Sequence, residues 1–202
     1  MIIPFNENSS AKIIADSIEI MKGGGVIAYP TESFYALGAL ATNEKALEKL
    51  FLLKKRPAEK PLPLIVGGPE ALAAVVKKLP ERAVELMKRY WPGPLTIVFE
   101  AADNISDLLT AGTGKVAVRV PGESVAMHLA RAAGFPITAT SANISTKSPA
   151  DNTDMIVNYF GDSIDMIIDG GRTPGGKPST IVDATVDPIR ILREGSVLLH
   201  AE

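Results

Sequence analysis

Helical and strand-like arrangements of apolar residues alternate through the chain. The first helix is predicted to begin at Ser9 or Ser10, either of which can cap it, and to end at three consecutive glycines, residues 23–25. Its apolar face comprises Ile13, Ile14, Ile18 and Met21. Asn43 is placed to cap a second helix. The apolar face of this second helix comprises Ala46, Leu47, Leu50 and Phe51. The same periodicity predicts helices over 70–78, 81–90, 124–133 and 153–160.

Short apolar runs bounded by glycine, proline or polar residues predict the strands. These runs cover residues 26–29, 62–66, 95–100, 116–120, 137–140, 166–168, 180–182 and 189–192. Alternation of strands and helices favours an α/β fold. The last strands follow one another without a helix and suggest a hairpin around Asp187-Pro188, so the sheet is predicted to be mixed. We find no internal repeat and no low-complexity linker, and therefore expect residues 1–202 to form a single domain.

Composition excludes several kinds of chemistry. The chain has 202 residues, no cysteine and two histidines, which argues against a disulfide framework, a thiolate zinc site, a cysteine nucleophile and a histidine-rich metal site. His128 lies in a helical pattern and His200 near the end of the chain, so both are expected to be structural or surface residues. The net charge of −2 means that any site for a polyanion must be local. With no signal-like segment and no long apolar run, a cytoplasmic protein without a membrane partner is expected.

A basic loop bounded by prolines is the first candidate site. It reads Lys54-Lys55-Arg56-Pro57-Ala58-Glu59-Lys60-Pro61. Pro57 ends the preceding helical pattern and Pro61 favours extended chain, so several cations must project from a short irregular segment. Such a cluster suits a polyphosphate or a carboxylate, and a solvated run of charges is the alternative interpretation.

Polar residues also collect at the ends of the predicted strands, where α/β proteins place ligands. These segments are 30–35, 119–121, 138–143, 178–180 and 193–195. Arg119 interrupts an otherwise apolar strand, which indicates either a pairing at the sheet edge or a two-pronged carboxylate ligand. Residues 171–177 match a phosphate-binding Walker loop up to Lys177, but Pro178 replaces the required Ser or Thr and a strand follows, so we reject that motif and expect a mobile loop beside the site.

Seven short motifs follow one another between Gly24 and about Ser196. They are Tyr29-Pro30-Thr31-Glu32-Ser33 with Tyr35 and Leu37-Gly38; Lys54-x-Arg56-Pro57 with Lys60-Pro61-Leu62; Trp91-Pro92-Gly93-Pro94-Leu95-Thr96; Val118-Arg119-Val120-Pro121; Ser141-Ala142-Asn143; Pro178-Ser179-Thr180-Ile181-Val182-Asp183; and Arg193-Glu194-Gly195. Together, in this order, they resemble the YrdC-type threonylcarbamoyl-AMP synthases. The resemblance implies a YrdC-like twisted, open mixed β-sheet flanked by helices, with a basic concave face.

The resemblance also implies a reaction. Members of this family condense L-threonine, bicarbonate and ATP into threonylcarbamoyl-AMP and pyrophosphate, with Mg²⁺ bound through the ATP phosphates. A separate transferase complex then modifies tRNA. Such chemistry needs positioning and charge neutralisation more than a protein nucleophile.

Roles for individual residues follow from the resemblance alone. Lys54 and Arg56 would be catalytic, and no protein residue is assigned to a metal. The residues implied to bind ATP are Lys54, Arg56, Lys60, Lys115, Ser141, Asn143 and Arg193. The residues implied to bind threonine are Thr31, Tyr35, Arg119, Ala139 and Ser179.

Two departures keep alternatives open. The chain has Tyr35-Ala36-Leu37-Gly38 where the family usually has Tyr-Gly-Leu-Gly, which looks more like a YciO-type paralogue, and Lys115 stands where a hydroxyl residue is frequent. The Lys-x-Arg and Ser-x-Asn motifs, which such paralogues tend to lose, are retained. A second alternative is a module that binds double-stranded RNA or tRNA through the basic face without synthase turnover. The net charge of −2 weighs against it.

Overall fold

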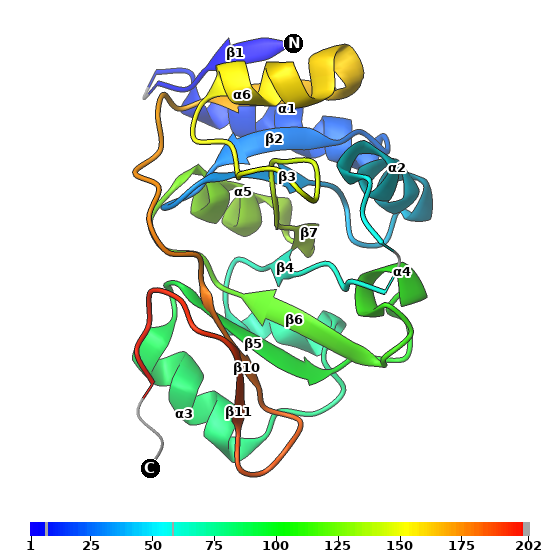
Figure 1. Cartoon of the computed structure of the whole chain (residues 1–202), viewed down its shortest axis with the longest axis vertical. Coiled ribbons are helices and arrows are strands. Elements are labelled where there is room, and N and C mark those ends of the chain that lie inside the picture. Colours follow the sequence, from blue (N-terminus) through cyan, green and yellow to red (C-terminus); the bar gives the residue numbers. More distant parts are fainter. Residues whose placement is uncertain (7, 58, 200–202) are drawn as a thin grey trace.

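The computed structural model describes residues 1–6, 8–57 and 59–199, and shows two mixed β-sheets with helices around them (Figure 1). His200 lies outside the described residues. The five-stranded sheet, in the upper part of Figure 1, consists in spatial order of β1 (Ile2–Pro4), β9 (Met166–Asp169), β2 (Ile27–Pro30), β3 (Tyr35–Gly38) and β8 (Thr140–Ser141). Pairing is parallel between β1, β9 and β2 and antiparallel from β2 through β3 to β8.

The six-stranded sheet lies in the lower part of the same view. Its spatial order is β11 (Arg190–Arg193), β10 (Thr180–Asp183), β5 (Leu95–Glu100), β6 (Lys115–Arg119), β4 (Leu64–Ile65) and β7 (Ile137–Thr138). Parallel pairs, β10 with β5 and β4 with β6, alternate with antiparallel ones. The predicted hairpin is the antiparallel pair β10–β11.

The predicted α/β class with mixed sheets and flanking helices is confirmed, but the strands form two sheets and not one. The chain passes between the sheets twice near the site. Ala139 joins β7 of one sheet to β8 of the other, and its N–H donates to the carbonyl of Pro63 at 2.8 Å. Further on, the segment 170–179 connects β9 to β10 and runs down one side of the molecule (Figure 1).

The helices are α1 (Ser10–Lys22), α2 (Glu44–Lys54), α3 (Glu81–Tyr90), α4 (Asp107–Thr110), α5 (Val125–Ala133) and α6 (Thr153–Phe160). The predicted apolar face of α1 is buried, although its N-cap residue Ser9 makes no side-chain capping bond. Asn43 caps α2 as predicted, because its side-chain oxygen accepts from the N–H of Ala46 at 3.1 Å. Among the described residues no helix is long and apolar enough to cross a membrane.

Some elements differ from the prediction. The helix expected over 70–78 is a 3₁₀ segment, Pro69–Ala74, after which Val76 forms a bridge with Ala101 and the chain leaves the helical path. Strand β3 was not predicted, although its residues are as buried as those of β2, because Tyr35 was assigned to the polar segment 30–35 and the apolar run left after it is very short. The short elements β1 and α4 were also missed.

Candidate functional site

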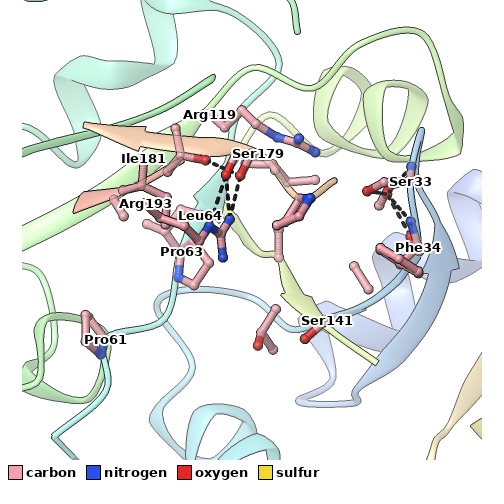
Figure 2. A pocket seen from close by; sticks show the side chains of 18 of the residues that line it. Ser33, Phe34, Pro61, Pro63, Leu64, Arg119, Ser141, Ser179, Ile181 and Arg193 are labelled. Carbon is pink, nitrogen blue, oxygen red and sulfur yellow. Dashed lines mark hydrogen bonds between the residues drawn. The ribbon is translucent and has the colours of Figure 1, made fainter. Parts of the chain in front are cut away.

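A cavity of about 550 Å³ lies between the two sheets, and the polar strand ends converge on it. The predicted site residues that line it are Thr31, Tyr35, Arg56, Lys60, Arg119, Ala139, Ser141, Ser179 and Arg193. Figure 2 shows Ser33 and Phe34 on one wall, facing Ser179 and Arg193 on the other. The five-stranded sheet contributes the turn between β2 and β3, and the six-stranded sheet contributes the ends of β6 and β11.

Lys54 is not part of the cavity lining. Its side chain is 1% exposed, and Nζ donates to the carbonyl oxygens of Ser141 and Asn143 and to the side-chain oxygen of Asn143. Burial, and secondly the charge of Arg56, lowers the pKa of the Lys54 ammonium from 10.5 to about 7. In this structure Lys54 therefore holds the Ser141–Asn143 segment.

Asn143 has a similar internal role. Its side-chain oxygen accepts from Lys54 and from the hydroxyl of Ser141 at 2.7 Å, and its side-chain amide donates to the carbonyl of Lys147. With these bonds the side chain is 7% exposed and lies outside the cavity lining. Of the Ser-x-Asn motif, only Ser141 reaches the cavity.

Lys115 is the third predicted residue outside the lining. Its Nζ lies 3.0 Å from a carboxylate oxygen of Asp183, whose side chain is 3% exposed. Because Lys115 begins β6 and Arg119 ends it, the two side chains are separated along the length of the strand. The structure thus places the Lys115 ammonium in an ion pair away from the cavity.

The cavity holds cations without matching acids. Arg56 donates to the carbonyls of Lys60 and Pro61 at 3.1 and 2.7 Å, and Arg193 donates to the carbonyl and hydroxyl of Ser179 at 2.8 to 3.1 Å. Burial lowers the pKa of Arg56, and burial together with the charge of Arg119 lowers that of Arg193. Within the described part of the chain, no carboxylate forms an ion pair with Arg56, Lys60 or Arg193. A bound polyanion would relieve this concentration of positive charge.

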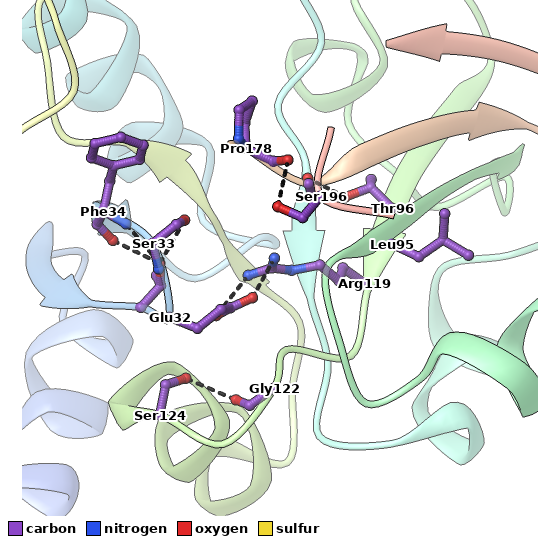
Figure 3. A network of polar contacts seen from close by, with 12 residues as sticks. Glu32, Ser33, Phe34, Leu95, Thr96, Arg119, Gly122, Ser124, Pro178 and Ser196 are labelled. Atoms are coloured by element: carbon purple, nitrogen blue, oxygen red, sulfur yellow. Dashed lines mark hydrogen bonds and ion pairs between the residues drawn. The ribbon is translucent and has the colours of Figure 1, made fainter. Parts of the chain in front are cut away.

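Arg119 is the exception, because it has an acidic partner. Nη1 lies 2.7 Å from one carboxylate oxygen of Glu32 and Nη2 donates to the other at 3.3 Å (Figure 3). The pair joins β6 of one sheet to the β2–β3 turn of the other, and both side chains are largely buried, at 11% and 24% exposure. Of the two sequence interpretations of Arg119, the structure shows the pairing directly, and Arg119 is also one of the residues that line the cavity. Glu32 was missed as a site residue, although it stands inside the Thr31 motif.

Thr31 and Tyr35 use their hydroxyl groups within the protein. The Thr31 hydroxyl donates to the carbonyl of Phe34 at 2.7 Å and accepts from the N–H groups of Ser33 and Phe34, which closes the β2–β3 turn. The Tyr35 hydroxyl donates to the carbonyl of Gly171 at 2.7 Å and accepts from the N–H of Gly170 at 3.1 Å. Burial raises the Tyr35 pKa to about 12, so this hydroxyl stays protonated at neutral pH.

The glycine- and proline-rich segment 170–178 lies beside the cavity, as expected. In addition to Tyr35, it is held by Thr173, which bonds to the carbonyl of Asp151, and by the N–H of Gly175, which donates to the carbonyl of Ser33 at 2.8 Å. Pro178 and Ser179 then enter the cavity lining, and β10 follows. The segment therefore leads into a strand, in agreement with our rejection of a Walker loop.

A protein-bound metal centre is not seen in the described residues, which contain no group of three or more His, Cys, Asp or Glu side chains arranged to hold an ion. The Ser179 hydroxyl instead lies 2.9 Å from that of Thr96, next to Arg193. Hydroxyls, backbone groups and guanidinium groups bind the oxygens of carboxylates and phosphates. The cavity is thus built for an anionic ligand.

Comparison with known proteins gives relatives for this arrangement. Residues 19–195 match the Sua5, YciO and YrdC family model, described as "Telomere recombination". A protein of Pyrococcus abyssi named threonylcarbamoyl-AMP synthase is 40% identical over 180 residues, which cover 89% of this chain and 53% of the relative. The chain thus spans about half the length of that relative.

Solved structures agree with the sequence match. The structure described as P. abyssi Sua5 complexed with L-threonine is 38% identical with a TM-score of 0.91, and the match covers 96% of this chain and 57% of that one. Escherichia coli YciO is 28% identical with a TM-score of 0.85, and the match covers 96% of this chain and 94% of that one.

Proposed function

The chain belongs to the Sua5, YciO and YrdC family, and we propose that it is a threonylcarbamoyl-AMP synthase acting on L-threonine, bicarbonate and ATP. The observation that carries the proposal is the cavity between the sheets, in which Arg56, Lys60 and Arg193 have no acidic partner among the described residues while Arg119 is held by Glu32. The three cations without an acidic partner suit the negative charges of a triphosphate. Arg119, whose charge Glu32 partly compensates, suits an amino acid, which carries a carboxylate and an ammonium group. A relative of similar fold is described as a complex with L-threonine.

The reaction needs two bonds to form. The threonine ammonium and bicarbonate give a carbamate, with loss of one water and one proton. A carbamate oxygen then attacks the α-phosphorus of ATP, and the bond between the α- and β-phosphates breaks to release pyrophosphate. Neither step requires a covalent bond to the protein, so catalysis consists of positioning and neutralisation of charge.

The cations would divide this work. Arg56, Lys60 and Arg193 would neutralise the phosphates, and the hydroxyl of Ser141 would contact the nucleotide. Lys54 would act indirectly. Its ammonium donates to oxygens of Asn143 and so holds the Ser141–Asn143 segment in place. Mg²⁺ would enter with the nucleotide, bound to its phosphate oxygens.

The threonine would lie against the walls that both sheets supply. Arg119 would take its carboxylate, and Ser179, Thr31, Tyr35 and the backbone at Ala139 would shape the pocket around it. The product is a mixed anhydride, which suits transfer of the threonylcarbamoyl group to tRNA by a separate transferase complex. L-threonine, ATP and bicarbonate are the small-molecule partners under this proposal, and tRNA is served through that downstream complex.

One observation favours a second candidate, a YciO-type paralogue. Ala36 lines the cavity, at the position where the synthases usually have glycine, and the E. coli YciO structure superposes well. A methyl group at this point takes space from a ligand that lies against β3. The paralogue would bind nucleotide in the same cavity without forming threonylcarbamoyl-AMP.

Incubation of the purified chain with Mg²⁺, ATP, L-threonine and bicarbonate tests the proposal. Pyrophosphate should appear only when all three substrates are present, and mass spectrometry should find threonylcarbamoyl-AMP. ATP binding without this product would refute the synthase and support the paralogue. RNA binding that falls steeply with salt and that ATP does not displace would support a nucleic-acid module instead.

A further inference from the structure

Glu32 occupies one particular edge of Arg119. A guanidinium group presents two edges to a carboxylate, the end formed by Nη1 and Nη2 and the side formed by Nε and one Nη. The two oxygens of Glu32 lie against Nη1 and Nη2, at 2.7 and 3.3 Å. Among the residues that the structure describes, no group other than Glu32 accepts a hydrogen bond from the guanidinium of Arg119, so the Nε side has no protein partner.

Arg119 faces the cavity and its partner does not. Arg119 is part of the cavity lining, whereas Glu32 is absent from it. In Figure 3, Glu32 reaches Arg119 from the β2–β3 turn, across the boundary between the sheets. Because Glu32 occupies the end formed by Nη1 and Nη2, the Nε side of the Arg119 guanidinium remains for a ligand.

The backbone around Glu32 is fixed as well. The hydroxyl of Thr31 accepts from the N–H groups of Ser33 and Phe34 at 3.2 and 3.3 Å, so the turn that carries Glu32 is closed from within. The N–H of Gly175 reaches the same turn by donating to the carbonyl of Ser33. A side chain on a closed turn holds its partner in a narrower range of orientations than one on an open loop.

We infer that Glu32 is a positioning residue for the amino-acid substrate: it holds the end of the Arg119 guanidinium so that the Nε side receives the substrate carboxylate. This inference rests on the proposed function, since it assumes an amino acid in the cavity. Glu32 also compensates the charge of a largely buried arginine, which is a purely structural role. The variant Glu32→Asp distinguishes the two roles. Aspartate still compensates the charge of Arg119, but its shorter side chain draws the guanidinium toward the turn and so changes its orientation.

Binding measurements on the full chain can separate these roles. The probes are L-threonine, L-threonine amide, which lacks the carboxylate, and ATP, each titrated by calorimetry into the wild type, Glu32→Gln and Glu32→Asp. We expect both substitutions to reduce the preference for L-threonine over its amide by about tenfold, since an aligned, charge-assisted pair of hydrogen bonds is lost. The affinity for ATP should change by no more than about twofold, because Glu32 does not line the cavity.

Thermal unfolding of each variant establishes that it is folded, and Asp103→Asn is the matched control. Asp103 pairs with Lys77 at 2.9 Å on the surface, where its side chain is 87% exposed, so its loss should leave every affinity unchanged. A folded Glu32→Asp with the wild-type preference for threonine over its amide would overturn the inference and leave Glu32 a charge-compensating residue. Equal loss of ATP and threonine binding in Glu32→Gln would overturn it too.

Failure of the proposed function gives a different result. If the wild type prefers L-threonine to the amide but releases no pyrophosphate, the synthase function is refuted. The role of Glu32 is then still decided by the preference for threonine over its amide in the two Glu32 variants. A wild-type protein that releases pyrophosphate in a threonine-dependent reaction, with the preference unchanged in both Glu32 variants, refutes the positioning role alone.

Discussion

The ammonium of Lys54 lies 2.9 Å from the carbonyl oxygen of Asn143 and 3.0 Å from its side-chain oxygen. Lys54 is the last residue of α2 and Asn143 follows β8, so this contact joins two motifs that are far apart in the sequence. The Lys-x-Arg motif is thereby divided: Lys54 turns into the protein to hold the Ser-x-Asn segment, and Arg56 turns to the cavity. Each half of the motif should respond differently to substitution.

Lys54→Met should destabilise the protein. Methionine fills a similar volume but leaves the carbonyl of Asn143 without its donor, whereas the carbonyl of Ser141 still accepts from the N–H of Asn143. An unpaired buried polar group costs about 1–3 kcal/mol. We expect a free energy of unfolding lower by that amount in urea denaturation, together with loss of pyrophosphate release. Unchanged stability with lost activity would indicate that Lys54 contacts the nucleotide directly.

The stability contributed at Lys54 should depend on pH. Its pKa is about 7 in the folded protein and 10.5 when unfolded, so between these values the unfolded chain binds more protons. The cost of burying the charge is fully present below pH 7 and disappears as the pH rises toward 10.5. The stability of the wild type relative to Lys54→Met should therefore rise from about pH 7 to about pH 10 in urea titrations. A difference that stays flat or falls over this range would contradict the lowered pKa.

Arg56→Lys should weaken ATP binding by about tenfold or more. Lysine keeps the charge but loses the planar fork that contacts the loop carbonyls and that, under the proposed function, also contacts a phosphate. Calorimetry with ATP measures the effect. Lys55→Gly is the matched control: it removes the adjacent cation, which does not line the cavity, at a residue whose φ of 47° glycine adopts readily. Unchanged ATP affinity in Arg56→Lys together with a loss in Lys55→Gly would mean that only the total charge of the loop matters.

Tyr35→Phe should loosen the segment 170–178. It removes the hydroxyl that bonds to Gly170 and Gly171, and leaves the ring in place. We expect a loss of about 1 kcal/mol in stability and faster amide hydrogen exchange near Gly170, with little change in β3. If exchange there matches the wild type while threonine binding falls, the hydroxyl belongs to the ligand and not to the segment.

Arg193→Lys should raise the Michaelis constant for ATP more than that for threonine. The guanidinium of Arg193 makes three hydrogen bonds to Ser179 and has no acidic partner among the described residues, so lysine would keep the charge and lose the fixed orientation. Ser179→Ala is the companion variant, since it removes one of these bonds and the contact with Thr96. A selective threonine defect in Arg193→Lys would move Arg193 into the threonine pocket.

Local signals were sufficient for much of the fold. Asn43 caps α2 because its side chain bonds to a backbone group three residues away, and the face of α1 is buried because its apolar residues recur with the helical period. The hairpin β10–β11 and the polar residues at the strand ends follow from equally short patterns. Such features depend on neighbours within a few positions, which the printed chain displays directly.

Pairing between distant segments decided the rest. That strands β2 and β6 belong to different sheets, and that Glu32 and Arg119 meet across the boundary between them, depends on contacts 87 residues apart that no local pattern encodes. The direction of Lys54 depends on carbonyl groups 87 and 89 residues away. A motif names the residue types a site contains, whereas burial and long-range hydrogen bonds determine which of them reach the ligand and which hold the site together.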